Sequence, residues 1–79
     1  MLLSGIGTAK DDERAARVYT KACDAGAGTS CYVLGLMCTR GVGVDKDPLR
    51  AEALFRRSCD GGEQDGCAEL ASLVRALNP

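Results

Sequence analysis

The chain lacks several features on which common functions depend. It has no histidine, which removes the usual general base and the commonest zinc ligand. It also has no Cys-x-x-Cys redox pair, no Gly-Lys-Ser/Thr phosphate loop and no Ser-x-x-Lys pair of the kind that serine β-lactamases use. Its formal net charge of -1 supplies no positive field to hold phosphates. We therefore expect neither a cofactor nor a nucleic-acid partner.

Cysteine, by contrast, is abundant. Five cysteines in 79 residues far exceed ordinary usage, and without histidine they favour disulfides over zinc sites or catalytic dyads. A chain this short gains only about 3 to 5 kcal/mol from its core, so covalent links or neighbouring units must support it. The N-terminal stretch 1–7 has no basic leader and is interrupted by Gly5 and Gly7. It predicts neither a signal peptide nor a membrane span in this chain.

The sequence repeats itself at an offset of 36 residues without gaps. A fixed period of this length indicates stacked helical units. The pairs include Gly5 with Gly41, Gly7 with Gly43, Lys10 with Lys46, Asp11 with Asp47, Arg14 with Arg50, Ala15 with Ala51, Cys23 with Cys59, Gly26 with Gly62, Cys31 with Cys67 and Leu34 with Leu70.

Each period contains signals for two helices. Asp47 is suited to cap a helix that starts at Pro48, and the glycines at 61 and 62 favour the left-handed turn that ends it. Asp65 is predicted to cap the following helix, over 66–77. By the same signals we expect helices over 12–25 and over 31–40, the latter starting after Thr29 or Ser30. The glycine pairs resemble the start of a dinucleotide loop, but they follow helices rather than strands, so turns are favoured.

The central unit resembles a Sel1-like repeat. The resemblance is carried by Leu34-Gly35, Gly41-Val42-Gly43-Val44, Asp47, Arg50-Ala51, and Phe55 with Cys59. A cysteine near the end of one helix and another eight residues on is similar to the cysteine-rich subclass, represented by the Helicobacter cysteine-rich proteins. The resemblance implies an all-α fold, in which antiparallel helix pairs form a fragment of a TPR/Sel1-like right-handed α-solenoid stapled by disulfides. The sequence departs from the family at Cys38, where tyrosine is usual.

In this interpretation the chain is one domain, 1–79. It comprises an incomplete repeat over 5–30, a full repeat over 31–66 and the start of the next over 67–77. Because helical repeats bury their faces on neighbours, we expect it to be part of a longer array.

The cysteine pairs Cys23 with Cys31 and Cys59 with Cys67 each flank a short glycine-containing turn between antiparallel helices. Such a turn brings the two Cα atoms within reach of a disulfide. In the chain-entropy model, a disulfide that closes a loop of nine residues stabilises the folded chain by about 2.5 kcal/mol. Reduced core thiols and a four-thiolate metal site are the alternatives, although metal sites use closer pairs.

The odd thiol, Cys38, lies seven residues after Cys31 and matches Val74 in the next repeat, which predicts a buried small hydrophobe. An intermolecular bridge or a reactive site is the alternative. A second stripe of residues, offset from the core stripe that bears the cysteines, is a candidate concave binding surface. The alternative is that it forms ordinary exposed or inter-repeat surface. Its members are Tyr32, Leu36, Thr39, Ala68, Ser72 and Arg75.

These patterns favour a scaffold or adaptor for a protein or peptide partner. The alternative is a penicillin-binding protein or weak β-lactamase, which rests on the resemblance alone and adds a cell-wall fragment or β-lactam as a partner. The expected location is extracytoplasmic, in the bacterial periplasm or secreted, with the mitochondrial intermembrane space as the alternative.

Overall fold

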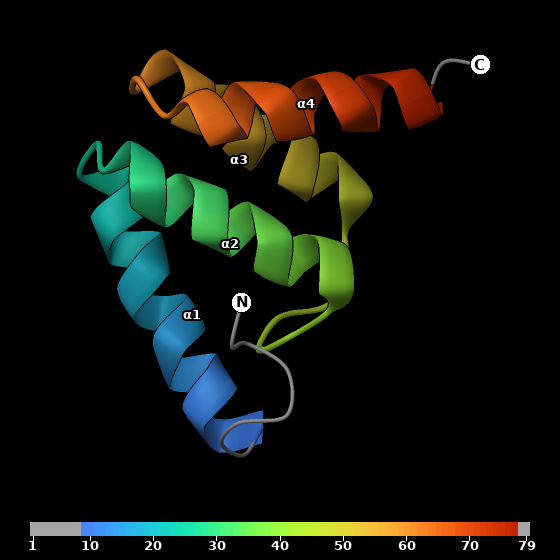
Figure 1. Ribbon diagram of the computed structural model, residues 1–79. Helices are drawn as coiled ribbons and strands as arrows, with labels where there is room; N and C mark the ends of the chain where they lie inside the picture. Colours follow the sequence, from blue (N-terminus) through green and yellow to red (C-terminus); the bar gives the residue numbers. More distant parts are fainter. Residues whose placement is uncertain (1–8, 78–79) are drawn as a thin grey trace.

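A computed structural model describes residues 9–77, which form four α-helices joined by short turns (Figure 1). The turn between the first two helices and the turn between the last two lie on one side of the molecule, and the longer second connection lies on the other. No strand occurs within residues 9–77. The prediction of an all-α repeat array is confirmed. The helices are α1 (Ala9–Asp24), α2 (Gly28–Arg40), α3 (Pro48–Asp60) and α4 (Gln64–Leu77).

Local signals set the connection between α2 and α3. The Oδ1 atom of Asp47 accepts a hydrogen bond of 3.1 Å from the backbone N–H of Arg50, and Pro48 occupies the first helical turn. This N-cap satisfies a backbone donor that a helix start leaves without a partner. At the end of α2, Gly41 adopts φ 72° and its N–H donates to Met37 O. The predicted cap at Asp47 is therefore confirmed.

Three helix starts differ from the predictions. α1 begins at Ala9 rather than at residue 12, and α2 begins at Gly28 rather than after Thr29 or Ser30. The N-cap of α2 is Ala27, which makes no side-chain cap hydrogen bond. α4 begins at Gln64, so Asp65 lies inside its first turn and is not the predicted cap.

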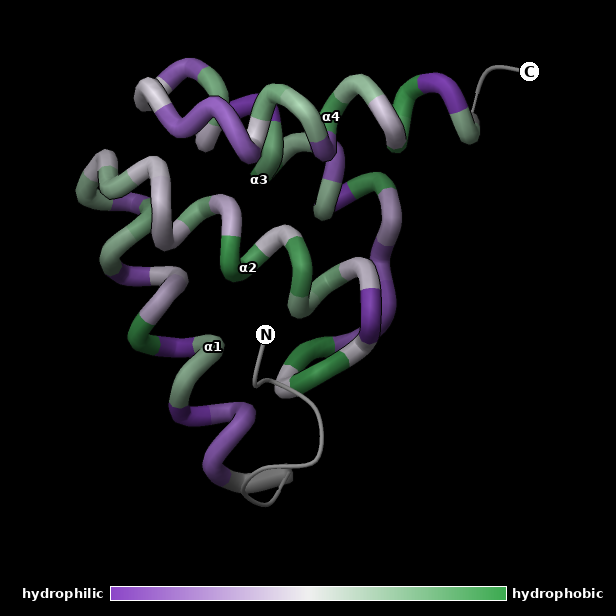
Figure 2. The backbone as a smooth tube through the Cα atoms, viewed as in Figure 1, coloured by the Kyte–Doolittle hydropathy of each residue, from purple (hydrophilic) through white to green (hydrophobic). Residues whose placement is uncertain are grey.

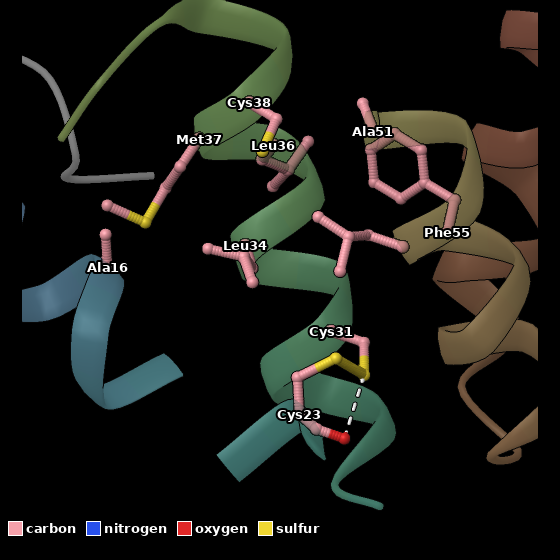
Figure 3. Close-up of a cluster of buried hydrophobic side chains, with 10 residues drawn as sticks. Ala16, Cys23, Cys31, Leu34, Leu36, Met37, Cys38, Ala51 and Phe55 are labelled. Atoms are coloured by element: carbon pink, nitrogen blue, oxygen red, sulfur yellow. Dashed lines mark hydrogen bonds between the residues drawn. A yellow bond between two sulfur atoms is a disulfide. The ribbon is translucent and has the colours of Figure 1, made fainter. Parts of the chain in front are cut away.

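The hydrophobic core centres on α2, which packs against α1, α3 and, over a smaller area, α4. Figure 2 shows apolar residues along α2 and mainly hydrophilic residues along α1. In Figure 3, Met37 points toward Ala16 of α1, and Phe55 and Ala51 lie on the α3 side. The buried apolar residues are Ala16, Cys23, Cys31, Leu34, Leu36, Met37, Cys38, Ala51, Leu54 and Phe55.

Polar contacts also join helices two steps apart in the chain. The guanidinium of Arg57 on α3 donates to Asp24 Oδ1 at 3.3 Å and to the carbonyl oxygen of Cys23 at 3.2 Å, both in α1. Thr29 at the start of α2 donates to Glu63 Oε1, just before α4, at 2.9 Å. These contacts link each helix to the second helix after it.

Candidate interaction surface

The α2 and α4 helices form a surface around the side chain of Tyr32. The ring of Tyr32 is half-buried and lies against the ring of Phe55, with centroids 6.1 Å apart and planes tilted by 51°. Burial raises the pKa of the Tyr32 phenol, and the nearby carboxylates of Glu69, Asp65 and Glu63 raise it further. The Tyr32 ring therefore packs against Phe55, and three carboxylates place negative charge in the neighbourhood of the Tyr32 hydroxyl.

The opposite charge occurs at the other end of the same two helices. Arg40 ends α2 and is close enough to Tyr32 to lower its pKa in part. Arg75, in the last turn of α4, is exposed. The surface is therefore acidic at the start of α4 and basic toward the ends of α2 and α4.

The six residues of the predicted concave stripe fall into three groups by exposure. Ala68, Ser72 and Arg75 are exposed on α4, and Tyr32 and Thr39 are half-buried on α2. Thr39 uses its hydroxyl within α2, where it donates to Gly35 O at 2.9 Å. Leu36 differs, because it is only 8% exposed and belongs to the core, so it offers no contact area to a partner. The binding role of the other five stays a prediction.

Sequence reasoning missed the three carboxylates that approach Tyr32. Glu63, Asp65 and Glu69 occupy the turn before α4 and its first half. Their concentration there was visible in the sequence. The sequence does not show which helix these carboxylates approach, because that depends on how α4 packs over α2.

Both predicted cysteine pairs form disulfides in the structure. Cys23 with Cys31 joins α1 to α2, and Cys59 with Cys67 joins α3 to α4, each with a Cα–Cα distance of 4.6 Å. The two differ in exposure. The first is buried, and Figure 3 shows its sulfurs beside the carbonyl oxygen of Cys23, 3.6 Å from Cys31 Sγ. Both cysteines of the second are half-exposed.

Cys38 is a free thiol and is fully buried on α2. Burial raises its pKa, Asp47 adds to the increase, and Arg50 opposes it. A buried thiol that stays protonated is a poor nucleophile. The structure thus places Cys38 in the core, as a small hydrophobe would be placed.

The described part of the chain contains no cluster suited to metal binding. Between residues 9 and 77, no group of three or more cysteines and carboxylates is placed to hold a metal ion. Ser58 is buried, and its hydroxyl has no hydrogen-bond partner among the described residues. A Cβ added at Gly66 would collide with that hydroxyl, which shows how closely α3 and α4 pack there. Among the described helices, none is long and apolar enough to cross a membrane.

The stacked antiparallel helices define the class of this protein, which is a helical repeat protein of the solenoid type. Comparison with protein families is more specific, since the Sel1 repeat model matches residues 1–26 and 28–63. The chain belongs to the Sel1 repeat family, whose members form helical solenoids that generally mediate protein interactions. The second match spans α2 and α3, so each disulfide has one cysteine inside that repeat, Cys31 or Cys59, and joins its helix pair to a neighbouring helix. Comparison with curated proteins and with solved structures gives no match.

Proposed function

We propose that this chain is a protein-interaction scaffold or adaptor that binds a peptide segment of its partner across α2 and α4. Membership of the Sel1 repeat family supports an interaction role in general. The observation that carries the specific proposal is the surface around Tyr32, where an aromatic ring supported by Phe55 is bordered by exposed positions of α4. Aromatic side chains supply contact area at a low entropic cost, which suits them to interfaces.

The charges of this surface indicate the chemistry of the partner. Carboxylates at one end favour a segment that carries lysine, arginine or backbone N–H donors there. Arg40 and Arg75 favour an acidic group or a carboxyl terminus at the other end. We therefore propose an extended peptide with opposite charges at its two ends, the basic end lying next to Glu63 and Asp65.

The disulfides support a finer placement of the protein. Two disulfides are consistent with an extracytoplasmic location, because reducing compartments keep cysteine thiols in the reduced form. We propose that the chain belongs to the cysteine-rich subclass of Sel1 repeats and acts in the bacterial periplasm or outside the cell. The mitochondrial intermembrane space is the alternative with the same redox chemistry.

No specific observation favours β-lactam hydrolysis or a cell-wall ligand. The sequence pattern that places a lysine one helical turn after a serine does not occur. Ser58, the serine buried beneath α4, is not accessible to a substrate.

The proposal is tested by selecting binders from a displayed peptide library on the oxidised chain and titrating them into isotope-labelled protein. We expect chemical-shift changes centred on Tyr32, Ser72 and Arg75. The Ser72→Arg variant should weaken binding at least tenfold by filling the surface, whereas Ala53→Arg, at an exposed position on α3, should not. The Glu69→Lys variant should select against basic peptides.

Two results would contradict the scaffold proposal. Binders whose shifts map to α1 or to the outer face of α3, with affinity unchanged in Ser72→Arg, would place the interaction elsewhere. Hydrolysis of a chromogenic β-lactam that follows the purified protein peak would favour the enzymatic alternative instead.

A further inference from the structure

A hollow of about 250 Å³ lies over the first disulfide, between the turn that joins α1 to α2 and the turn that follows α3. All of its lining residues fall between positions 23 and 61, so it is built wholly within the described helices and turns. Two of them form the Cys23–Cys31 bridge, which makes the hollow an approach to that bridge from solvent. The lining residues are Cys23, Gly26, Cys31, Arg57, Asp60 and Gly61.

The walls of the hollow differ in how much room they leave. A Cβ added at Gly26 would meet no other part of the chain within 4 Å, so the space beside this turn is free. A Cβ added at Gly61 would lie 3.2 Å from the Cα atom of Gly28, so the two backbones are in contact there. The hollow is therefore open beside Gly26 and closed where the start of α2 meets the end of α3.

Arg57 is the side chain placed to cover the bridge. Cys23 is only 1% exposed and Cys31 only 2% exposed, although the hollow reaches both residues. Among the residues that line the hollow between positions 23 and 61, Arg57 has the only long side chain. Its Nη2 atom donates to the carbonyl oxygen of Cys23 at 3.2 Å, and that oxygen lies 3.6 Å from Cys31 Sγ (Figure 3). One backbone oxygen thus holds the guanidinium next to the sulfur.

The contacts that hold Arg57 are mostly open to solvent. Its Nη1 atom lies 3.3 Å from Asp24 Oδ1, and the two side chains are 49% and 65% exposed. An exposed ion pair of this kind contributes little and is screened by salt. The charge-assisted hydrogen bond to the carbonyl oxygen of Cys23 is the stronger contact. Moving the Arg57 side chain breaks these two contacts and leaves the backbone hydrogen bonds of the helices intact.

We propose that Arg57 is a removable cover over the Cys23–Cys31 bridge, and that its departure lets a small thiol reductant reach the bridge through the hollow. With Arg57 displaced, one thiolate of a small dithiol attacks a cysteine sulfur. The S–S bond breaks, and its electron pair stays on the other cysteine sulfur, which takes a proton from water. The second thiolate of the reductant then attacks its own sulfur in the mixed disulfide and releases the first cysteine. The dithiol is oxidised to a cyclic disulfide, and both cysteines are reduced.

The cover and the bridge belong to different helix pairs. Arg57 lies on α3, whereas the bridge joins α1 to α2. The contact of Arg57 with α1 therefore couples the redox sensitivity of this bridge to the position of the following helix. Neither Arg57 nor Asp24 belongs to the surface around Tyr32, so the proposal does not depend on peptide binding.

Timed reduction of the oxidised chain by dithiothreitol, with each bridge followed by alkylation and peptide mapping, tests the proposal. Arg57→Ala should speed the reduction of Cys23–Cys31 by roughly tenfold or more, because a hydrogen bond from a charged group is lost. The rate for Cys59–Cys67 should stay almost unchanged and serves as the internal reference. Arg57→Lys, which keeps the charge, should give an intermediate rate. The matched control is Arg56→Ala, whose side chain pairs with Glu52 within α3, and it should leave both rates unchanged.

Salt provides a second test on the original sequence. Raising sodium chloride from about 0.01 M to about 0.5 M screens the exposed pair of Arg57 with Asp24. The rate of reduction of Cys23–Cys31, relative to that of Cys59–Cys67, should therefore rise in the original chain. In Arg57→Ala the same ratio should not change with salt.

Labelling of the buried Cys38 thiol by iodoacetamide, before any reductant is added, separates a local cover from a general loosening of the fold. We expect equally slow labelling of Cys38 in the original chain and in Arg57→Ala. Three results would each overturn the proposal. They are an unchanged ratio of the two reduction rates in Arg57→Ala, an equal acceleration in Arg56→Ala, and an acceleration in Arg57→Ala that is matched by faster labelling of Cys38.

Discussion

Gly35 sets how closely α2 and α3 approach each other, and replacing it with alanine tests this directly. An alanine Cβ would lie 2.6 Å from Cε1 and 2.9 Å from Cδ1 of the Phe55 ring. The ring is only 2% exposed and has Tyr32 beside it, so it has little room to move away. The two helices must separate or the ring must leave its preferred rotamer.

The expected cost is the difference between two opposing effects. Overpacking a core by one methyl group costs about 1 to 3 kcal/mol. Replacing glycine by alanine in a helix interior returns up to about 1 kcal/mol. We therefore expect Gly35→Ala to lower the free energy of unfolding by about 1 kcal/mol, which corresponds to a melting temperature lower by roughly 4 to 8 °C.

Urea denaturation of the oxidised protein, followed by circular dichroism, measures this change. The control is Ala71→Gly at the matching position of α4, which is exposed and should lose only the intrinsic helix propensity of about 1 kcal/mol. The double variant Gly35→Ala with Phe55→Leu should be less destabilised than the sum of the two single variants, because leucine removes the collision. A Gly35→Ala variant more stable than the original chain would show that propensity alone decides, and would refute the close contact.

Further predictions concern the disulfides, the α3 cap and the free thiol. The half-exposed Cys59–Cys67 bridge should be reduced before the buried one in limiting dithiothreitol, at a cost of about 2.5 kcal/mol; peptide mapping that finds the buried bridge opening first would contradict this. Asp47→Ala should lower stability by about 1 kcal/mol in urea denaturation, and Asp47→Asn, which keeps the accepting oxygen, by much less. Burial raises the pKa of Cys38 above its ordinary 9.0, so the unfolded chain loses this proton first and stability should fall as the pH rises above 9. Cys38→Ala should remove the part of this loss of stability that comes from the thiol. Iodoacetamide should modify the Cys38 thiol only when the protein unfolds.

Local signals in the sequence were enough to predict the connection between α2 and α3. Asp47 followed by Pro48 determines a helix start without help from distant residues, and Gly41 supplies the left-handed conformation that ends α2. The start of α2 could not be found in this way. Its N-cap is Ala27, and Gly28 lies so close to α3 that a Cβ there would be 3.1 Å from Ser58 O. The start of α2 is therefore marked by close packing against α3 and not by a capping side chain.

The candidate surface was predictable only in part, because helical periodicity shows which residues share a face but not how many neighbours cover it. Three helices pack around α2, so burial extends past the cysteine-bearing stripe and includes Leu36. The matching residue on α4, Ser72, stays exposed. Two residues at the same place in the repeat therefore differ in availability to a partner.

The positions of the two sulfur bridges determine how the protein responds to a pulling force. Each bridge spans eight positions along the chain and holds its two Cα atoms 4.6 Å apart. A stretched segment of that length would extend by about 20 Å more. Tension between the ends of the chain passes through the bridges, so the turns they enclose bear no load and add no extension. Until the bridges are reduced, the stretch between Cys31 and Cys59, which holds most of α2 and α3 and the connection between them, can still lengthen.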